Sequence, residues 1–368
     1  MGSSYPLNIV SASLGKVFIL MRFFRSFVHP GRKGRLPLPE YASHHIQRKM
    51  AKDIAIGIDI GGQTSKIGVV NAEGGILARS VIRTDTYGKD AEAFVDALAA
   101  AVKGLIAQTG TEGRVRGIGA GAPNANYYTG CISNAPNLEW AADGCVEFSR
   151  MLSERMGGLP VRLTNDANAA AAGEMKYGVA KGMKDFIMIT LGTGVGSGIV
   201  IGGNIVYGHD GCAGELGHVC VERESGRLCG CGKKGCLECY CSATGVARTA
   251  KEWLQASDEP SMLREVNNLS SKAVFDAAVS GDALAIRIFD YTGTILGRSL
   301  ADFIAFSSPE AIVLFGGLAR AGELLMDPVR KAMDDNVLRQ WRGKVKLLHS
   351  ALSESDAAIL GASALAFM

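Results

Sequence analysis

The feature that most constrains the fold is a β-hairpin pattern that occurs twice, about 130 residues apart. In the first copy, the apolar run Ile54–Ile60 leads into a glycine-rich tip, and a second run ends at Asn71. In the second copy, the run 185–192 leads into alternating glycines, and the next run ends at Ile201. Short apolar runs bounded by glycine are typical of strands. The long spacing indicates a duplicated chain, not an array of short repeats.

Other strands and helices are expected around these hairpins. Apolar residues recur every three or four positions between Phe94 and Ile106, which predicts a helix with one buried face. A helix around 284–303 carries apolar residues on two faces and should therefore be buried. The pattern also predicts strands at 76–82, 115–121, 161–164, 204–207 and 311–315, and helices near 146–156, 167–177 and 353–367. The alternation of strands and helices predicts an α/β fold.

The tip of the first hairpin has the residue types of a phosphate-binding loop. Gly61 and Gly62 let the backbone approach a ligand closely and direct amide groups at an anion. Thr64 adds a hydroxyl group, Lys66 adds a cation, and Asp59 could hold a metal ion or its water. The spacing is not that of a Walker A loop. An ordinary hairpin turn is the alternative.

The second tip contains Gly192, Thr193 and Gly194 within another run of alternating glycines. Two such loops at equivalent places in a duplicated chain could grip a nucleoside triphosphate from two sides. A third glycine turn, at Gly316 and Gly317, follows a buried strand, where open α/β sheets receive ligands. We expect adenosine to bind there; a plain strand-to-helix turn is the alternative.

Five of the nine cysteines fall within thirteen residues. The glycine-rich loop that carries Cys229, Cys231 and Cys236 can supply three thiolates, and His218 can supply a fourth ligand. This set predicts a structural zinc site. Cys239 and Cys241 are interpreted as packed thiols, although the spacing also allows either of them to replace a ligand.

Carboxylates near these loops suggest chemistry beyond phosphate and zinc binding. Glu215 and Glu238 flank the cysteine loop and could accept hydrogen bonds from several hydroxyl groups, which suggests a polyol or sugar; surface solvation is the alternative. Asp166 follows a predicted strand and could act as a general base toward a hydroxyl that attacks a γ-phosphate. Its alternative role is an ordinary helix N-cap.

Composition and charge exclude some classes of protein. The chain has 39 basic and 36 acidic residues, but eight basic residues and one acidic residue lie in the first 50. The remainder is slightly acidic, so no nucleic-acid partner is expected. No apolar stretch is long enough for a membrane span, and a secretory signal is disfavoured. Residues 1–50 have no sustained periodicity, and we interpret them as an extension that is disordered or not native, with Met50 as the natural start; a genuine disordered basic tail is the alternative.

Together these motifs resemble the ROK family of sugar kinases and repressors. The resemblance rests on Asp59-x-Gly-Gly with Lys66, on Leu191-Gly-Thr-Gly-x-Gly, on Thr164-Asn-Asp-Ala-Asn, on Glu215-x-Gly-His and on Cys229-x-Cys-Gly-x-x-Gly-Cys-x-Glu. It covers about residues 54–366 in order. The cysteine motif with its upstream Glu-x-Gly-His is the most specific part.

The resemblance implies an actin-like, ribonuclease H-like ATPase fold with two lobes and a central cleft. We expect a small lobe over 51–165, a large lobe with the zinc loop over 166–352, and the helix 353–368 packed back on the small lobe. ATP, Mg²⁺ and a hexose substrate are implied, in a cytoplasmic homodimer or homotetramer of carbohydrate metabolism and glycolysis.

The family also assigns roles to residues by position. Asp166 matches the catalytic base, and the sugar contacts match Asn137, Asn165, Glu215, His218 and Glu238. Two positions depart from the family pattern. Asn124 stands where glycine is usual after Gly-x-Pro, and Gln63 stands where threonine is commonest in the first tip.

The expected activity is transfer of the γ-phosphate of ATP to the 6-hydroxyl group of glucose. An N-acetylglucosamine or N-acetylmannosamine kinase is the close alternative, because these motifs do not separate the substrates. A sugar-responsive transcriptional regulator is a more distant alternative, since the fifty residues before the kinase-like region show no helix-turn-helix pattern.

Overall fold

The computed structural model describes residues 52–368. The predictions about residues 1–50, including the start at Met50, lie outside these residues.

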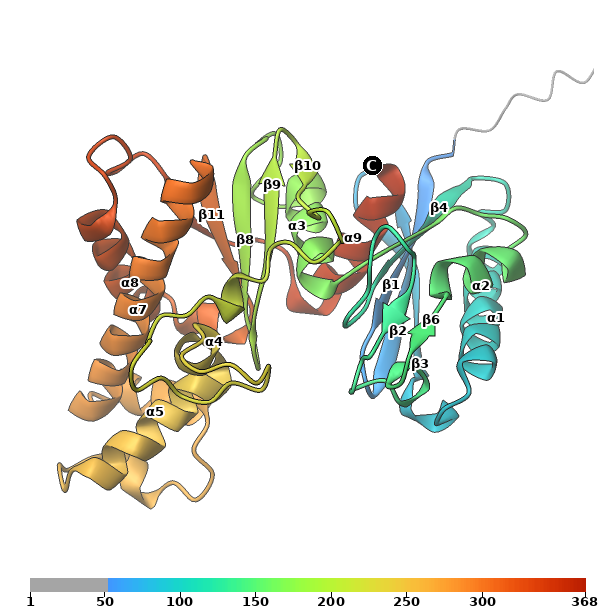
Figure 1. The fold of residues 1–368 in the computed structure, drawn as a ribbon. Coiled ribbons are helices and arrows are strands. Elements are labelled where there is room, and N and C mark those ends of the chain that lie inside the picture. The colour runs from blue at the N-terminus through green and yellow to red at the C-terminus, as the bar shows by residue number, and fades with distance from the viewer. Residues whose placement is uncertain (1–51) are drawn as a thin grey trace, which may run out of the picture. The chain divides into compact units, whose positions relative to one another are not determined.

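The first half is built on a five-stranded sheet with the order β3-β2-β1-β4-β7 (Figure 1). β1 (Ile54–Ile60) pairs antiparallel with β2 (Thr64–Asn71), and β2 pairs antiparallel with β3 (Ile76–Arg83). β4 (Val115–Gly121) and β7 (Val161–Thr164) extend the sheet in parallel. The predicted strands of this half are confirmed, β1, β4 and β7 with the expected bounds.

The second half repeats this arrangement. Its sheet has the order β10-β9-β8-β11-β12, with β8 (Phe186–Leu191), β9 (Val195–Ile201), β10 (Asn204–Ile205), β11 (Ala311–Phe315) and β12 (Lys346–His349). Each sheet starts with an antiparallel hairpin and continues with two parallel strands. The predicted duplication of the α/β unit is therefore confirmed.

Helices cover both halves. In the first half these are α1 (Ala91–Thr109) and α2 (Phe148–Arg155). A minor sheet of two short strands, β5 (Ile132–Ser133) and β6 (Cys145–Val146), lies between the two helices in the sequence. α1 begins at the N-cap Asp90 and ends at Gly110, which adopts the left-handed conformation. The second half contains α4 (Glu238–Cys241), α5 (Ala243–Ala256), α6 (Ser271–Val279), α7 (Ala283–Ser307) and α8 (Glu323–Asn336). α7 is buried along much of its length, as predicted, and packs closely on α8.

Two helices, α3 (Asp166–Tyr177) and α9 (Glu354–Phe367), pack on each other and on the sheets. α9 runs so close to β1 and β4 that a Cβ atom at Gly119 would lie 1.8 Å from the carbonyl oxygen of Ala362. A Cβ atom at Gly57 would lie 2.1 Å from the carbonyl oxygen of Ile359. Glycine is required at both strand positions because the helix backbone occupies the space of a side chain.

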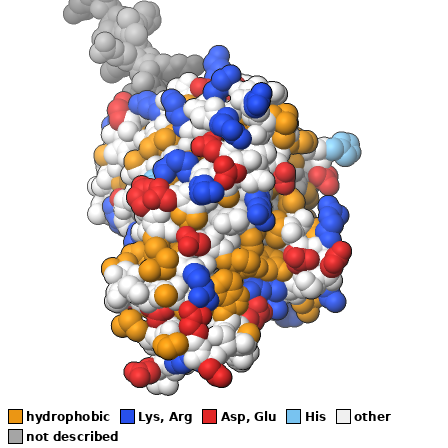
Figure 2. Space-filling view, turned by 90° about the vertical axis from the view of Figure 1, so that its left-hand side faces the viewer, with side chains coloured by type: hydrophobic (Ala, Val, Ile, Leu, Met, Phe, Trp, Pro, Cys, Tyr) orange, Lys and Arg blue, Asp and Glu red, His pale blue; other side chains and the backbone are white. Residues whose placement is uncertain are grey.

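The surface agrees with the mixed charge of residues 52–368. On the face drawn in Figure 2, acidic and basic side chains are interspersed around an area where apolar side chains gather. Within the described part of the chain, no helix is both long and apolar enough to cross a membrane.

Candidate active site

The first hairpin tip places a carboxylate and an ammonium group side by side. Asp59 and Lys66 are directly paired across β1 and β2, and their charged groups lie 3.9 Å apart. Burial raises the pKa of Asp59, Lys66 opposes this shift, and the negative charge of Asp166 adds to it. Asp166 therefore lies within electrostatic reach of the first tip. Within the tip, the amide of Gly61 donates to the carbonyl of Thr64 over 3.1 Å.

The second tip, between β8 and β9, is held by residues of the cysteine region. The amide of Ala243 donates to the carbonyl of Gly192, and the Thr244 hydroxyl donates to the carbonyl of Thr193 over 2.7 Å. The Thr244 contact was not predicted, because a hydroxyl residue in the first turn of a helix also suits local capping. The residues that follow α4 therefore fix the backbone of the second tip.

Glu238 also contacts this tip. Its Oε2 accepts a hydrogen bond from the amide of Val195 over 3.0 Å, while its Oε1 lies 3.6 Å from the Cys229 thiol. A Cβ atom at Gly194 would lie 2.3 Å from Glu238 Oε2, so the approach requires glycine. Sequence reasoning assigned Glu238 to a sugar and missed this contact between the second tip and the cysteine loop.

The strand β7 ends at Thr164 and leads directly into α3. The Oδ1 atom of Asn165 accepts the amide of Asn168 over 2.8 Å, so Asn165 is the N-cap. The alternative reading of Asp166 as an N-cap was wrong, because Asp166 is the first residue of the helix. Its side chain is exposed, and its Oδ1 lies 2.9 Å from the amide nitrogen of Ala167. The cap orients the start of α3 and leaves the Asp166 carboxylate facing outward.

A short 3₁₀ helix, Leu216–His218, carries His218 and is preceded by Glu215. Burial raises the pKa of Glu215, and the charges of Asp166 and Glu238 raise it further, while His218 lowers it. Asp166, His218 and Glu238 therefore lie close enough to Glu215 to act on its charge, and His218 Nδ1 and Glu238 Oε1 lie 3.7 and 3.6 Å from the Cys229 sulfur atom. Three acidic groups and an imidazole there can accept or exchange protons with several hydroxyl groups of one ligand.

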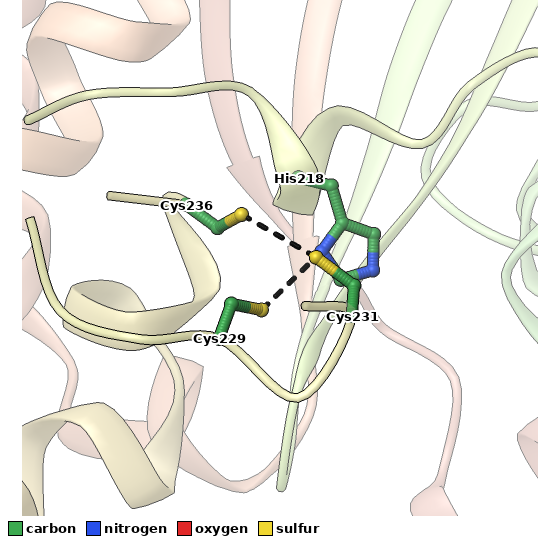
Figure 3. A group of neighbouring side chains, drawn as sticks. All are labelled: His218, Cys229, Cys231 and Cys236. Atoms are coloured by element: carbon green, nitrogen blue, oxygen red, sulfur yellow. Dashed lines mark hydrogen bonds between the residues drawn. The ribbon is translucent and has the colours of Figure 1, made fainter. Parts of the chain in front are cut away.

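The structure brings together the four predicted metal ligands (Figure 3). The ligand atoms of His218, Cys229, Cys231 and Cys236 all lie within 4.8 Å of one another. The Cys231 and Cys236 sulfur atoms are 3.7 Å apart, and Cys229 Sγ is 3.7 Å from His218 Nδ1. Zinc bonds of about 2.3 Å in a tetrahedron place sulfur atoms about 3.8 Å apart. The donor set and its spacing therefore fit a zinc ion.

The two other cysteines of the cluster differ in their surroundings. Cys241 is fully buried, and its thiol donates to the carbonyl of Thr292 in α7, which agrees with its interpretation as a packed thiol. The thiol of Cys239 donates to the carbonyl of Leu228 over 3.7 Å and also lies beside Cys229, next to the candidate metal site.

The third glycine turn borders a pocket. Gly316 follows β11, and Gly317 begins a 3₁₀ helix that ends at Ala321. The pocket has a volume of about 350 Å³ and is lined by Lys272, Phe275, Phe289, Gly317, Leu318 and Arg320, among others. Phe275 is the partly exposed ring beside this turn, and an aromatic face suits the flat base of a nucleotide.

Asn137 lies beside the first tip. A Cβ atom at Gly62 would be 2.7 Å from the carbonyl oxygen of Asn137, so the two backbones approach closely. The exposed side chain of Asn137 is therefore carried next to the first hairpin tip.

The two departures from the family pattern have a structural account. Asn124 has a φ of 52°, in the left-handed region that glycine and asparagine tolerate best. Its side chain donates to the carbonyl of Asn134 over 2.7 Å. At Gln63 the backbone carbonyl accepts the amide of Thr84 over 2.8 Å, a bond that any side chain allows.

Comparisons with known proteins agree with this arrangement. A sequence model described as the ROK family matches residues 55–368. The chain is 36% identical to a glucokinase of Halalkalibacterium halodurans, over 83% of this chain and 92% of that protein. It is 37% identical to a glucokinase of Streptomyces coelicolor, over 85% of this chain and 97% of that protein.

A solved structure gives the same result. The ROK family glucokinase of Streptomyces griseus, crystallised in complex with glucose and AMPPNP, is 36% identical, covers 85% of this chain and 98% of its own, and superposes with a TM-score of 0.67. The expected actin-like α/β fold is confirmed by this match and by the repeated sheet order. The chain belongs to the ROK family.

Proposed function

We propose that this chain, an ATP-dependent sugar kinase of the ROK family, transfers the γ-phosphoryl group of ATP to the 6-hydroxyl group of glucose. One observation carries the proposal: His218 Nδ1 and Glu238 Oε1 lie 3.7 and 3.6 Å from the same Cys229 sulfur, and the charge of Asp166 acts on both Glu215 and Asp59 of the first tip. The similarity to glucokinases over most of the chain supports glucose as the substrate.

In the proposed reaction, Asp166 is the general base. Its carboxylate accepts the proton of the 6-hydroxyl group while that oxygen forms a bond to the γ-phosphorus, and the bond from phosphorus to the bridging oxygen of ADP breaks. Because Asp166 lies in the first turn of α3, its carboxylate is exposed to a ligand. The hydrogen bond from the Asn168 amide to the Asn165 side chain fixes the direction of the helix start.

The hexose would be held by hydrogen bonds from the neighbouring polar groups. Glu215 and Glu238 accept from sugar hydroxyl groups, and His218 offers a ring nitrogen. Because Asn165 Oδ1 already accepts the amide of Asn168, its Nδ2 group is the part left to donate to a hydroxyl. Asn137 would contribute from the side of the first tip.

ATP would be bound by the three glycine turns. The first tip, with Gly61, Gly62, Thr64 and Lys66, and the second tip, with Gly192, Thr193 and Gly194, are proposed to hold the phosphates. The pocket beside Gly316 and Gly317 is proposed to hold adenosine. Asp59 would hold Mg²⁺ through its waters, and bound Mg²⁺ supplies charge neutralisation on the phosphates.

Zinc is proposed to bind His218, Cys229, Cys231 and Cys236 as a structural ion. All four ligands come from the protein, which is typical of structural sites. Glu238 lies two residues after Cys236, the last of the proposed ligands, so a bound ion would fix the position of that carboxylate.

The division into lobes over 51–165 and 166–352 is also proposed. It is supported by the separate sheet of each half and by the contacts of α9 with β1 and β4. Assembly as a homodimer or homotetramer, a cytoplasmic location and a role in glycolysis remain proposals that rest on the family.

The test is ADP release by the purified full-length chain with ATP and Mg²⁺ on glucose, mannose, N-acetylglucosamine and N-acetylmannosamine. We expect the highest kcat/KM on glucose. A higher kcat/KM on an N-acetylhexosamine would contradict the assigned substrate and keep the kinase mechanism. Lack of turnover on all four sugars would contradict the proposed function and favour a sugar-responsive regulator.

A further inference from the structure

Three tyrosines from two distant segments meet at one place. Tyr127 stacks on Tyr207 with ring centroids 4.0 Å apart and an angle of 5° between the rings. Tyr128 contacts both rings edge-on, at 5.7 Å from Tyr127 and 6.1 Å from Tyr207. We call Tyr127, Tyr128 and Tyr207 the tyrosine latch. Tyr207 packs against the apolar core beside β8 and β9, which fixes one side of the contact.

Two hydrogen bonds join the same segments. The Tyr128 hydroxyl donates to the carbonyl of Gly208 over 2.8 Å, and Asn126 Nδ2 donates to the carbonyl of Asp210 over 2.6 Å. A Cβ atom at Gly211 would lie 2.5 Å from Asn126 Nδ2, so the close approach depends on glycine there. Both acceptors are backbone carbonyls, which makes the contact sensitive to the shape of the turn after β10.

Asn126 also shapes its own segment. Its Oδ1 accepts the amides of Tyr128 and Thr129, over 3.0 and 3.1 Å. One side chain therefore forms the local turn with its oxygen and reaches the other segment with its nitrogen.

The turn after β10 leads directly to Glu215. The amide of Ala213 donates to the carbonyl of Tyr207, which closes the turn. The Ser197 hydroxyl donates to the carbonyl of Gly214 and accepts the amide of Leu216, on either side of Glu215. The position of the Glu215 backbone is therefore set by the turn and by β9 together.

The other segment leads to Asn137. It runs from β4 through Asn126 into β5, and the amide of Ser133 donates back to the carbonyl of Asn124. Asn137 follows four residues after Ser133 and lies against Gly62 in the first tip. The latch thus joins the two chain segments that carry Glu215 and Asn137.

We infer that the tyrosine latch and Asn126 are positioning residues that set hexose affinity by holding these two segments in the geometry that binds the sugar. This inference rests on the proposed function, because it assigns Glu215 and Asn137 to the hexose. The aromatic contacts of the latch and the two hydrogen bonds of Tyr128 and Asn126 are each of modest strength, so the loss of one of them should change hexose affinity without unfolding the chain.

The first test is Tyr128→Phe, which removes one hydroxyl and keeps the ring. We expect the KM for glucose to rise about fivefold, the change that corresponds to one lost hydrogen bond, with the KM for ATP unchanged and kcat changed less than KM. Tyr87→Phe is the control, since the Tyr87 ring packs edge-on against Phe94 in the first half.

The second test is Asn126→Asp. This variant keeps an oxygen that accepts the amides of Tyr128 and Thr129, but it places an acceptor where Nδ2 donated to Asp210. We expect a larger rise in the KM for glucose than in Tyr128→Phe.

Hydrogen exchange of the full-length chain gives a readout that does not depend on the sugar. Tyr128→Phe and Asn126→Asp should both speed exchange of amides 208–216, while exchange in α1 stays unchanged. Active variants with wild-type KM values for glucose would overturn the inferred positioning role of the tyrosine latch and leave the proposed function intact. A wild-type chain that phosphorylates no sugar would overturn the proposed function and, with it, the hexose role; faster exchange would then show only that the contact is structural.

Discussion

Asp166→Asn is the substitution that most directly tests the assigned base. The Asn side chain has the same shape, and its Oδ1 can keep the short local contact with the Ala167 amide, so α3 should still begin at this residue. What is lost is the ability to accept a proton. General-base catalysis contributes about 10²- to 10⁴-fold, or about 3–5 kcal/mol of activation free energy. We expect kcat to fall within this range while the Kd for glucose changes less than about threefold.

The assay follows ADP release at saturating glucose, with glucose binding measured separately by calorimetry. Asp335→Asn is a matched control, because Asp335 is an exposed acid on α8 that pairs with Lys331. The same charge change there should leave kcat unchanged. Turnover of Asp166→Asn close to the wild-type value would refute the base assignment, and a loss of glucose binding as large as the loss of kcat would show that Asp166 acts in binding.

Further predictions concern the metal loop, the packing of α9 and the pH dependence. Cys231→Ser should lose bound zinc, measured by metal analysis, and weaken glucose binding, because the loop carries Glu238; full glucose affinity in a metal-free variant would contradict this. Gly119→Ala should lower the free energy of unfolding by about 1–3 kcal/mol or more in urea titrations, since the new Cβ meets the carbonyl of Ala362 at 1.8 Å. The raised pKa of Glu215 means that its carboxylate becomes protonated at a higher pH than an ordinary glutamate, so the KM for glucose should rise as the pH falls, and this rise should begin above the range of an ordinary glutamate. Glu215→Gln should flatten that rise, and an unchanged pH profile in this variant would assign it to another group.

The strands were predictable where the chain forms continuous apolar runs that end in glycine or a polar residue. β1 and β11 are buried along most of their length, and their sequences contain the bulky branched residues that mark such strands. β12 was not predicted, because its four residues are half-buried or exposed and include Lys346 and His349. Its position in the sheet comes from parallel pairing with β11, a long-range contact that has no local signal.

The convergence of the four candidate metal ligands was also predictable. Three cysteines within eight residues, with glycines between them, can converge whatever the rest of the fold does. His218 lies eleven positions before Cys229, so only a short segment has to bring it to the cysteine loop. The capping roles at the start of α3 were harder, because Asn165 and Asp166 are both favourable cap residues and only the backbone decides between them.

The double role of Glu238 could not be derived from spacing at all. One of its oxygens holds the amide of Val195 in the second phosphate tip, and the other faces the Cys229 thiol, 3.6 Å away. These contacts join residues that are 43 and 9 positions from Glu238. Glu238 lies two residues after Cys236 and accepts the amide of Val195, so a change in the metal loop can shift the second tip. On the proposed assignments the metal loop then affects both the nucleotide site and the hexose site, and loss of the metal should weaken ATP binding together with glucose binding.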